Sequence, residues 1–474
     1  MSEVFNLSLS QLNSLIQQHD LTAEFVLSQY LERIKKINKD LNAIISLAPE
    51  NELLARAREI DKLNDKERKE ANLLGIPIAI KDLEDTKGIR TTYGSKIFSD
   101  YIPEIDGPTA KKLRMSGSIF VGKTNTPEFG IGSHTFNSIF GATRNPYNSN
   151  LSAGGSSGGA AVAVATSMLP IADGSDMMGS LRNPAAFNNI YGFRPTIGLI
   201  NDSQDYVEEP YRLSTSGPMA KKPEDLGYLL QILINPDNAT KEILDIRQQS
   251  KIIKSISCKN IKIGWLADLT DQYYFEDGIL QLCQECLKTL SYCGSQVSSI
   301  KSNIRAEELW QSWTTLRSLS LRQSLGKMFN LEEKKHLLKS EIIWEINNCN
   351  KIGTIEKENA INIQNNLRKI VEELFLDNDF LALPSTSVFP FKVDLRYPTE
   401  INGNVLDTYH RWMEVVTLVS LLGLPCVSLP CGLNSQGLPT GIQIIGRPFS
   451  DIEILSLAQT YSKTTDKDKI NPIT

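Results

Sequence analysis

The chain has 474 residues, of which 41% are hydrophobic and 22% are charged, and its formal net charge is −5. This composition is ordinary for a soluble globular protein, and the small net charge gives no reason to expect binding to nucleic acid. No apolar run approaches the ~20 residues that a membrane helix needs, so we expect no membrane span. The length allows two or three average domains, or one elaborated domain.

The first 70 residues are expected to form helices. Ser8 and Gln11 match a capping box, in which each side chain bonds the other residue's backbone. Val26, Tyr30 and Ile34 then recur at helical spacing, which predicts a buried stripe on a second helix. Residues 50–63 are rich in Ala, Leu, Glu and Arg, and this composition favours a third helix.

Apolar strands and helices alternate through the rest of the chain. The segments expected to be strands are residues 75–80, 118–121, 261–266, 380–384 and 426–429. Because these segments are apolar on both faces, we expect an α/β fold with a mixed, largely parallel central sheet covered by helices on both faces.

The chain is expected to fold as one large domain, because it has no internal repeat and no long linker. Within residues 1–474 we expect N-terminal helices over 1–70, a core over 71–200, a helical elaboration over 270–375 and a C-terminal return to the sheet over 376–474. The elaboration is expected to cover the functional site.

The seven cysteines are odd in number and thinly spread, which favours reduced thiols and a cytoplasmic protein. Cys283 and Cys286 have C-x-x-C spacing, but they fall among apolar residues at helical spacing, and no second pair lies nearby. We therefore expect both to be helix residues. The sequence implies no metal and no organic cofactor.

Two serine-containing turns and a lysine form the main candidate site. Ser156 and Ser157 lie within the glycine-rich run 154–159, and Ser180 follows Gly179. Lys81 ends the apolar strand expected at 75–80, where burial would lower the pKa of its amine toward that of a useful base. Taken singly, a glycine- and serine-rich segment is more often an ordinary turn than a catalytic site, and a lysine at the end of a strand is more often solvated than buried.

The segment from Gly117 to Thr124 fits the phosphate-loop pattern G-x-x-x-x-G-K-T. A phosphate loop follows a strand and opens a helix, whose N-terminus helps to hold the phosphates. Here the residues between the two glycines are themselves strand-like, and no long helical stripe follows Thr124. We therefore expect Lys123 to have no role in nucleotide binding.

The run 154–158 also fits the nucleophile pattern G-x-S-x-G, which needs a preceding strand and a later histidine. A polar loop precedes it. The four histidines are His19, His134, His336 and His410. Only the last two lie downstream, and His336 is expected to be exposed on a lysine-rich helix. His410 stays open as a pocket residue, and each histidine is expected to have a surface or packing role.

The same segments resemble the amidase signature family of serine hydrolases, which cleave carboxylic amides. The matching segments are residues 80–82, 91–95, 122–125, 128–129, 140–141, 145–146, 154–159, 174–176, 182–185, 423–425, 428–430 and 437–443. The ordered matches extend over most of the chain, and residues 75–195 are the densest part.

The resemblance implies a role for each candidate residue. Ser180 matches the nucleophile, Ser156 matches the bridging serine, whose preceding peptide bond is cis in the family, and Lys81 matches the base. The backbone N–H groups of Met177, Met178, Gly179 and Ser180 match the donors to the oxyanion. The remaining family positions are Gly130, whose carbonyl faces the relay or substrate, and Asp82, Asp176 and Arg182, which are expected to support the site.

One position departs from the family pattern. Relatives have two glycines before the nucleophile, whereas this chain has Met178 and Gly179. If the position of Met178 requires a positive φ, methionine there carries strain of about 1 kcal/mol or more. If it does not, the side chain narrows the pocket for the acyl group.

The resemblance therefore implies an amidase that acts on a small carboxylic amide through a serine acyl-enzyme. Two alternatives stay open: the amidase subunit of a glutamyl-tRNA(Gln) amidotransferase, which would have a partner protein, and an inactive scaffold with the same fold. The substrate is expected to be a small-molecule amide, and the family resemblance also allows a homodimer.

Overall fold

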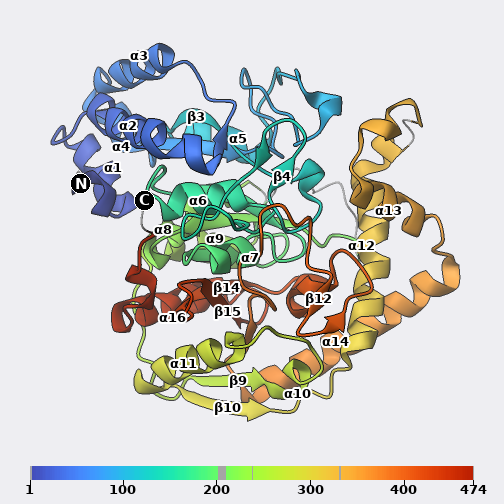
Figure 1. Ribbon diagram of the computed structural model, residues 1–474. Coiled ribbons are helices and arrows are strands. Elements are labelled where there is room, and N and C mark those ends of the chain that lie inside the picture. The colour runs from blue at the N-terminus through green and yellow to red at the C-terminus, as the bar shows by residue number, and fades with distance from the viewer. Residues whose placement is uncertain (1–2, 201–209, 238, 330–331, 473–474) are drawn as a thin grey trace.

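The computed structural model describes residues 3–200, 210–237, 239–329 and 332–472. Four helices form the N-terminal part and pack together in Figure 1: α1 (Leu9–Gln17), α2 (Ala23–Leu41), α3 (Glu50–Asp61) and α4 (Asp65–Glu70). The predicted capping box is confirmed, because Ser8 Oγ accepts the N–H of Gln11 and the Gln11 side chain accepts the N–H of Ser8. The predicted stripe on α2 is buried.

A small sheet carries the lysine strand. Its strands are β1 (Ile44–Ile45), β3 (Ile119–Thr124) and β2 (Pro77–Lys81), in that order across the sheet. β2 and β3 are parallel and are joined through α5 (Pro108–Met115), whereas β1 is antiparallel to β3. The expected strands at 75–80 and 118–121 are therefore present, but they form a sheet of their own beside the larger one.

The larger sheet has the strand order β10-β9-β11-β15-β14-β7-β8-β6. The ranges are β6 (Ala172–Asp176), β7 (Tyr191–Arg194), β8 (Thr215–Ala220), β9 (Lys262–Leu266), β10 (Gln296–Ile300), β11 (Phe380–Pro384), β14 (Cys426–Leu433) and β15 (Pro439–Ile445). The mixed α/β sheet is confirmed. Its pairing needs a correction, because only β10–β9 and β9–β11 are parallel within it and the other pairs are antiparallel. Strands buried on both faces look alike in sequence whichever way their neighbours run.

Helices cover the larger sheet. In Figure 1, α7 (Arg182–Phe187) lies above β14 and β15, and α11 (Ile279–Tyr292) lies below them. The small-residue helix α6 (Gly158–Ala165) packs against β6 and β8, and α16 (Asp451–Thr464) packs against β14. The other helices of this part are α8 (Pro223–Leu233), α9 (Lys241–Ser250), α10 (Ala267–Thr270) and α15 (Thr417–Leu422).

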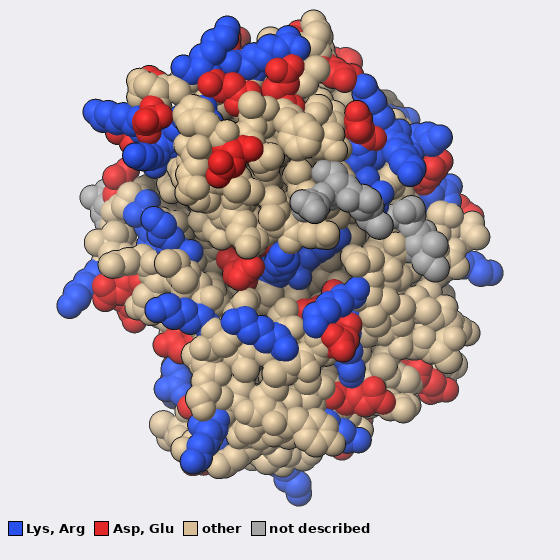
Figure 2. Space-filling model, turned by 90° about the vertical axis from the view of Figure 1, so that its left-hand side faces the viewer, with Lys and Arg blue, Asp and Glu red and all other residues tan. Residues whose placement is uncertain are grey.

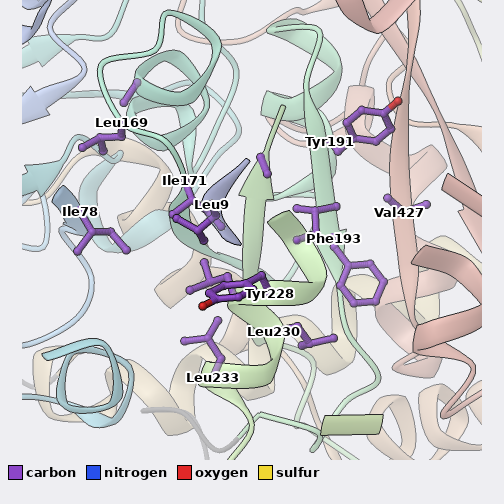
Figure 3. Packing of buried hydrophobic residues seen from close by; sticks show 14 of the residues in the cluster. Leu9, Ile78, Leu169, Ile171, Tyr191, Phe193, Tyr228, Leu230, Leu233 and Val427 are labelled. Atoms are coloured by element: carbon purple, nitrogen blue, oxygen red, sulfur yellow. The ribbon is translucent and has the colours of Figure 1, made fainter. Parts of the chain in front are cut away.

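One hydrophobic core joins the N-terminal helices to the sheets. Figure 3 shows Leu9 of α1, Ile78 of β2, Tyr228 of α8 and Val427 of β14 within the same buried cluster. Cys283 and Cys286 are also buried in this cluster, on α11, as expected for helix residues. Close packing in this core holds the lysine strand, β2, against the larger sheet, although the two sheets are not joined by backbone hydrogen bonds between their described strands.

Three long helices flank the molecule on the right of Figure 1: α12 (Ala306–Phe329), α13 (Ser340–Cys349) and α14 (Thr354–Asp377). The minor elements are β4 (Phe136–Asn137), β5 (Gly141–Ala142), β12 (Glu400–Ile401) and β13 (Asn404–Val405). Within the described ranges, every helix is too short or too polar to cross a membrane. Figure 2 shows one face of the molecule, on which acidic and basic side chains are interspersed.

Candidate active site

Lys81, Ser156 and Ser180 line the same cavity, whose volume is about 750 Å³. Lys81 is the last residue of β2, Ser156 lies two residues before α6, and Ser180 lies in the turn between β6 and α7. The two sheets and two helices therefore bring together three residues that are far apart in the sequence. This is the arrangement that the family resemblance implied.

The amine of Lys81 is surrounded by serine hydroxyls. Its Nζ atom lies 2.8 Å from Ser156 Oγ, 2.8 Å from Ser157 Oγ and 3.0 Å from Ser175 Oγ. The residue is only 2% exposed. Burial lowers the pKa of Lys81 to about 7, although Asp173 and Asp176 act in the opposite direction. An amine with this pKa is largely neutral just above neutral pH and can accept a proton.

The double-serine loop reaches the nucleophile turn through its backbone. The Gly155–Ser156 peptide bond is cis, as the resemblance implied. The N–H of Ser157 donates to the carbonyl of Ser180 at 3.3 Å, which holds the two turns side by side. Between the described hydroxyls of Ser156 and Ser180, however, no hydrogen bond is formed. Hydrogen bonds between catalytic groups often tighten only when substrate binds.

The nucleophile turn folds around the carboxylate of Asp176. This carboxylate accepts the N–H of Gly179 at 2.9 Å and that of Leu181 at 3.1 Å, and it also pairs with Arg182. Asp176 and Arg182 therefore hold the turn that contains Ser180. The prediction of four oxyanion donors needs a correction at Gly179. With a φ of 77°, this residue directs its N–H to Asp176 instead of the cavity.

Three of the predicted donors stay available. The N–H groups of Met177, Met178 and Ser180 have no hydrogen-bond acceptor among the residues that the structure describes. All three residues line the cavity. Unpaired donors beside a nucleophile can stabilise the oxyanion of a tetrahedral intermediate.

Met178 adopts an ordinary backbone conformation, since its φ is not positive. The strain considered for this position is therefore absent. Its side chain is 4% exposed, and its sulfur accepts the indole N–H of Trp313 at 3.3 Å. The methionine consequently fills part of the cavity wall, as expected for a residue that narrows the pocket.

Gly130 has a φ of 70° and lies close to the bridging serine. A Cβ atom at this position would approach Ser156 Oγ to 3.4 Å and Leu83 Cδ1 to 2.7 Å. Gly130 therefore lies beside Ser156, where glycine suits both the positive φ and the close approach.

Asp82 does not contact the lysine amine. Its carboxylate accepts the N–H of Thr92 at 3.1 Å and faces Lys123. The acid that lies against Lys81 is Asp173, which sequence reasoning missed. Ser175 was missed as well, and Ser157 was named in the glycine-rich run but given no role, although both lie in segments that match the family. Contacts between residues on two different sheets cannot be predicted from the spacing of residues along the sequence.

The lysine of the phosphate-loop pattern is buried inside β3. Lys123 Nζ donates to the carbonyl of Glu84 and, at 2.6 Å, to Thr86 Oγ1. The pattern thus lies largely on a strand, and α6 begins far beyond it. The lysine is occupied by its own protein, which fits the expectation that it holds no phosphate.

The two downstream histidines lie away from Ser180. His336 is exposed, within a 3-10 turn at Glu332–Leu337 rather than the expected helix. His410 is buried and stacks on Tyr409, with ring centroids 4.5 Å apart, and burial lowers its pKa well below the usual value. Neither histidine lines the cavity that holds the serines. Upstream, His134 bonds Ser152 and Val393 in a packing role.

The cavity walls are mainly apolar and aromatic. The apolar lining residues are Leu83, Tyr93, Phe98, Tyr101, Phe129, Ile131, Met177, Met178, Leu321, Leu325 and Met413. α12 supplies part of this wall, so the helical elaboration contributes to the site. Its Arg317 also lines the cavity, but this guanidinium is paired with Glu345 and donates to the hydroxyl of Tyr409 at 2.9 Å.

These features define a class of enzyme: an α/β protein with a buried lysine between two serine turns. The Amidase family model matches residues 25–455, and the chain belongs to the amidase signature family. It is similar to the A subunit of the glutamyl-tRNA(Gln) amidotransferase of Saccharolobus solfataricus, with 30% identity over 95% of each chain.

Solved structures of the family have the same fold. A bacterial aryl acylamidase aligns with a TM-score of 0.86 and 22% identity, covering 99% of this chain and 98% of its own. The A subunit of the glutamyl-tRNA(Gln) amidotransferase from Thermotoga maritima aligns with a TM-score of 0.73 and 25% identity, covering 98% of this chain and 94% of its own. The fold is therefore shared by members with different named activities.

Proposed function

We propose that this protein cleaves the C–N bond of a carboxylic amide through an acyl-enzyme on Ser180. The observation that carries the proposal is the 2.8 Å contact between Lys81 Nζ and Ser156 Oγ, in a cavity that Ser180 also lines. A nucleophile, a bridging hydroxyl and a buried base are the parts that acyl transfer requires.

The hydrogen bonds around Lys81 are compatible with a neutral amine. Its two N–H groups can donate to Ser157 Oγ and Ser175 Oγ, and its lone pair can accept the proton of Ser156. Ser156 Oγ then has a lone pair free for the proton of Ser180. In this scheme the proton moves from Ser180 to Ser156 while the proton of Ser156 moves to Lys81.

The carbon–oxygen bond to Ser180 forms as the proton leaves its hydroxyl. The carbonyl oxygen of the substrate takes up negative charge, which the N–H groups of Met177, Met178 and Ser180 are placed to stabilise. When the tetrahedral intermediate collapses, the C–N bond breaks and the relay returns the proton to the leaving nitrogen. Water then hydrolyses the ester to regenerate Ser180.

A second candidate shares the first half of this reaction. The curated relatives favour the amidase subunit of a glutamyl-tRNA(Gln) amidotransferase more directly than a stand-alone amidase, because they have that name and match along almost the whole chain. In such a complex the ammonia released at Ser180 would pass to a partner instead of to solvent.

The cavity favours a stand-alone enzyme acting on an apolar amide. Free glutamine carries an α-carboxylate, which would bind most strongly to an arginine or lysine that has no acidic partner within the protein. Arg317 reaches the cavity, but Glu345 neutralises it from within the protein. The aromatic and aliphatic walls instead suit an apolar acyl or aryl group.

We also propose the cytoplasm as the compartment of this protein. All seven cysteines lie in the described residues, and all seven are unpaired. Thiols that stay reduced are typical of a reducing compartment.

The test is to measure amine or ammonia release from aliphatic amides, aryl amides and glutamine by the purified protein. Turnover of apolar amides by the isolated chain would support a stand-alone amidase. Glutamine cleavage that appears only with a co-purifying protein would support the amidotransferase reading. A folded protein that cleaves none of these amides, alone or with a partner, would contradict the proposed chemistry.

A further inference from the structure

Asp173 lies where the two sheets meet. It belongs to β6, the last strand of the larger sheet, and its carboxylate reaches Lys81 at the end of β2 in the smaller sheet. The backbone N–H of Lys81 donates to both carboxylate oxygens, at 3.2 and 3.3 Å. A side chain thus provides, at this lysine, the hydrogen bond that a neighbouring strand would provide within a sheet.

Asp173 differs from the other acids near the lysine. Asp176 pairs with Arg182 and Arg194, and Asp82 faces Lys123 on β3. Asp173 is 3% exposed and lines the catalytic cavity, and no salt bridge of the described residues includes it. Among the described residues, its carboxylate therefore lacks the arginine partners that Asp176 has.

We propose that Asp173 is a positioning residue for Lys81, fixing the backbone at the end of β2 and placing a negative charge close to that lysine. The inference rests on the proposed function, because it concerns the base of that reaction. The carboxylate fixes the backbone from which the Lys81 side chain extends toward the serines, and its charge makes the amine a stronger proton acceptor than burial alone would allow.

The charges that face Lys81 support this assignment. Burial lowers the pKa of Lys81 to about 7, while Asp173 and Asp176 on β6 raise it. Burial also raises the pKa of Asp173 to about 6, whereas the N–H of Lys81 and the charges of Lys123 and Lys81 lower it. The two groups therefore influence each other: the charge of Asp173 favours the ammonium form of Lys81, and the charge of Lys81 favours the carboxylate form of Asp173.

The test is the variant Asp173→Asn, in which the amide oxygen can still accept the N–H of Lys81 but the charge is lost. The pH profile of kcat/KM is measured for an amide that the wild type cleaves. We expect the acidic limb to move by about one pH unit to lower pH, because the opposing charge no longer favours the ammonium form. A merely structural role would lower activity without moving the limb.

Asp451→Asn is the matched control. Asp451 is fully buried on α16, accepts the N–H of Thr196 at 2.9 Å, and has its pKa raised by burial to about 6, as Asp173 has. It lies outside the cavity. The acidic limb of the pH profile of Asp451→Asn is expected to coincide with that of the wild type.

A second readout needs no turnover. Acetic anhydride modifies neutral amines, so the extent of acetylation at Lys81, measured by peptide mass spectrometry across pH, follows its protonation directly. The midpoint should fall in Asp173→Asn. A shifted midpoint in a protein that cleaves no amide would support the positioning role and contradict the proposed function. If Asp173→Asn has the same acidic limb of kcat/KM and the same acetylation midpoint as the wild type, the positioning role is overturned. If the Asn variant does not fold, Asp173→Ser is judged by the same criterion.

Discussion

Asp176 and Arg182 form a fully buried ion pair on either side of Ser180, with Oδ1 of the acid 2.9 Å from Nη2 of the arginine. The guanidinium also donates to Gln443 Oε1 at 2.8 Å and to Ser420 Oγ at 2.7 Å. The pair therefore ties the nucleophile turn to β15 and α15. The position of Ser180 depends on charges that the substrate never touches.

Replacing Arg182 with Met should destabilise the protein by about 3–5 kcal/mol, because the buried carboxylate of Asp176 would lose its two hydrogen bonds from Arg182 and, of its arginine contacts, keep only the longer one with Arg194, at 3.4 Å. Urea denaturation measures the change in the free energy of unfolding. Arg56→Gln is the control, since Arg56 pairs with Glu59 on the exposed face of α3 and should change stability by less than about 0.5 kcal/mol. Equal effects of the two substitutions would contradict a structural role for the buried pair.

The same ion pair predicts a loss of stability in acid. Burial raises the pKa of Asp176, but Arg182 and Arg194 lower it further, so that the folded-state value lies well below the usual range. A depressed carboxyl pKa contributes stability that is present above about pH 4 and is lost as the pH falls toward the folded-state value. In Asp176→Asn this part of the acid dependence of unfolding should disappear, which denaturation at several pH values would detect.

The activity of the wild type should rise with pH through about 7, because Lys81 must be neutral to accept a proton and burial lowers its pKa to about 7. The acidic limb of log kcat/KM should have a slope near one, as expected for a single proton. Activity that stays level from about pH 5 to about pH 8 would exclude Lys81 as the base.

Met178→Ala should widen the cavity on the side of Trp313, whose indole N–H now bonds the methionine sulfur. We expect the ratio of kcat/KM for bulky over small acyl groups to rise about tenfold, the range expected for one or two added methylenes in an apolar pocket. Leu325→Ala, at another wall of the same cavity, serves as the comparison. An unchanged ratio in Met178→Ala would place the acyl group elsewhere.

Local patterns predicted much of the fold. The capping box at Ser8, the buried stripe of α2 and the helix that holds Cys283 and Cys286 are where the sequence placed them. Strand direction and sheet membership were harder, because they depend on which distant segment lies alongside. The sequence of β2 looks the same whether it pairs within the larger sheet or beside it.

In the candidate site, too, local motifs could be predicted from the sequence but contacts between distant segments could not. The family motifs located Lys81, Ser156 and Ser180, and the structure brings all three to one cavity. Gly179 could not be judged from its position in the motif, because the direction of its N–H follows from backbone angles and from the buried carboxylate of Asp176. Asp173 escaped notice because its contact with Lys81 crosses between two sheets.

The most direct test of the central claim is to trap the acyl-enzyme. Intact-protein and peptide mass spectrometry would follow the wild type, Ser180→Ala and Lys81→Ala during turnover of a slowly hydrolysed aryl amide. The account predicts an acyl adduct on Ser180 in the wild type, none in Ser180→Ala, and adduct formation slowed about 10²–10⁴-fold in Lys81→Ala, the range of general-base catalysis. Amide turnover that persists in Ser180→Ala, or an adduct on another residue, would contradict it.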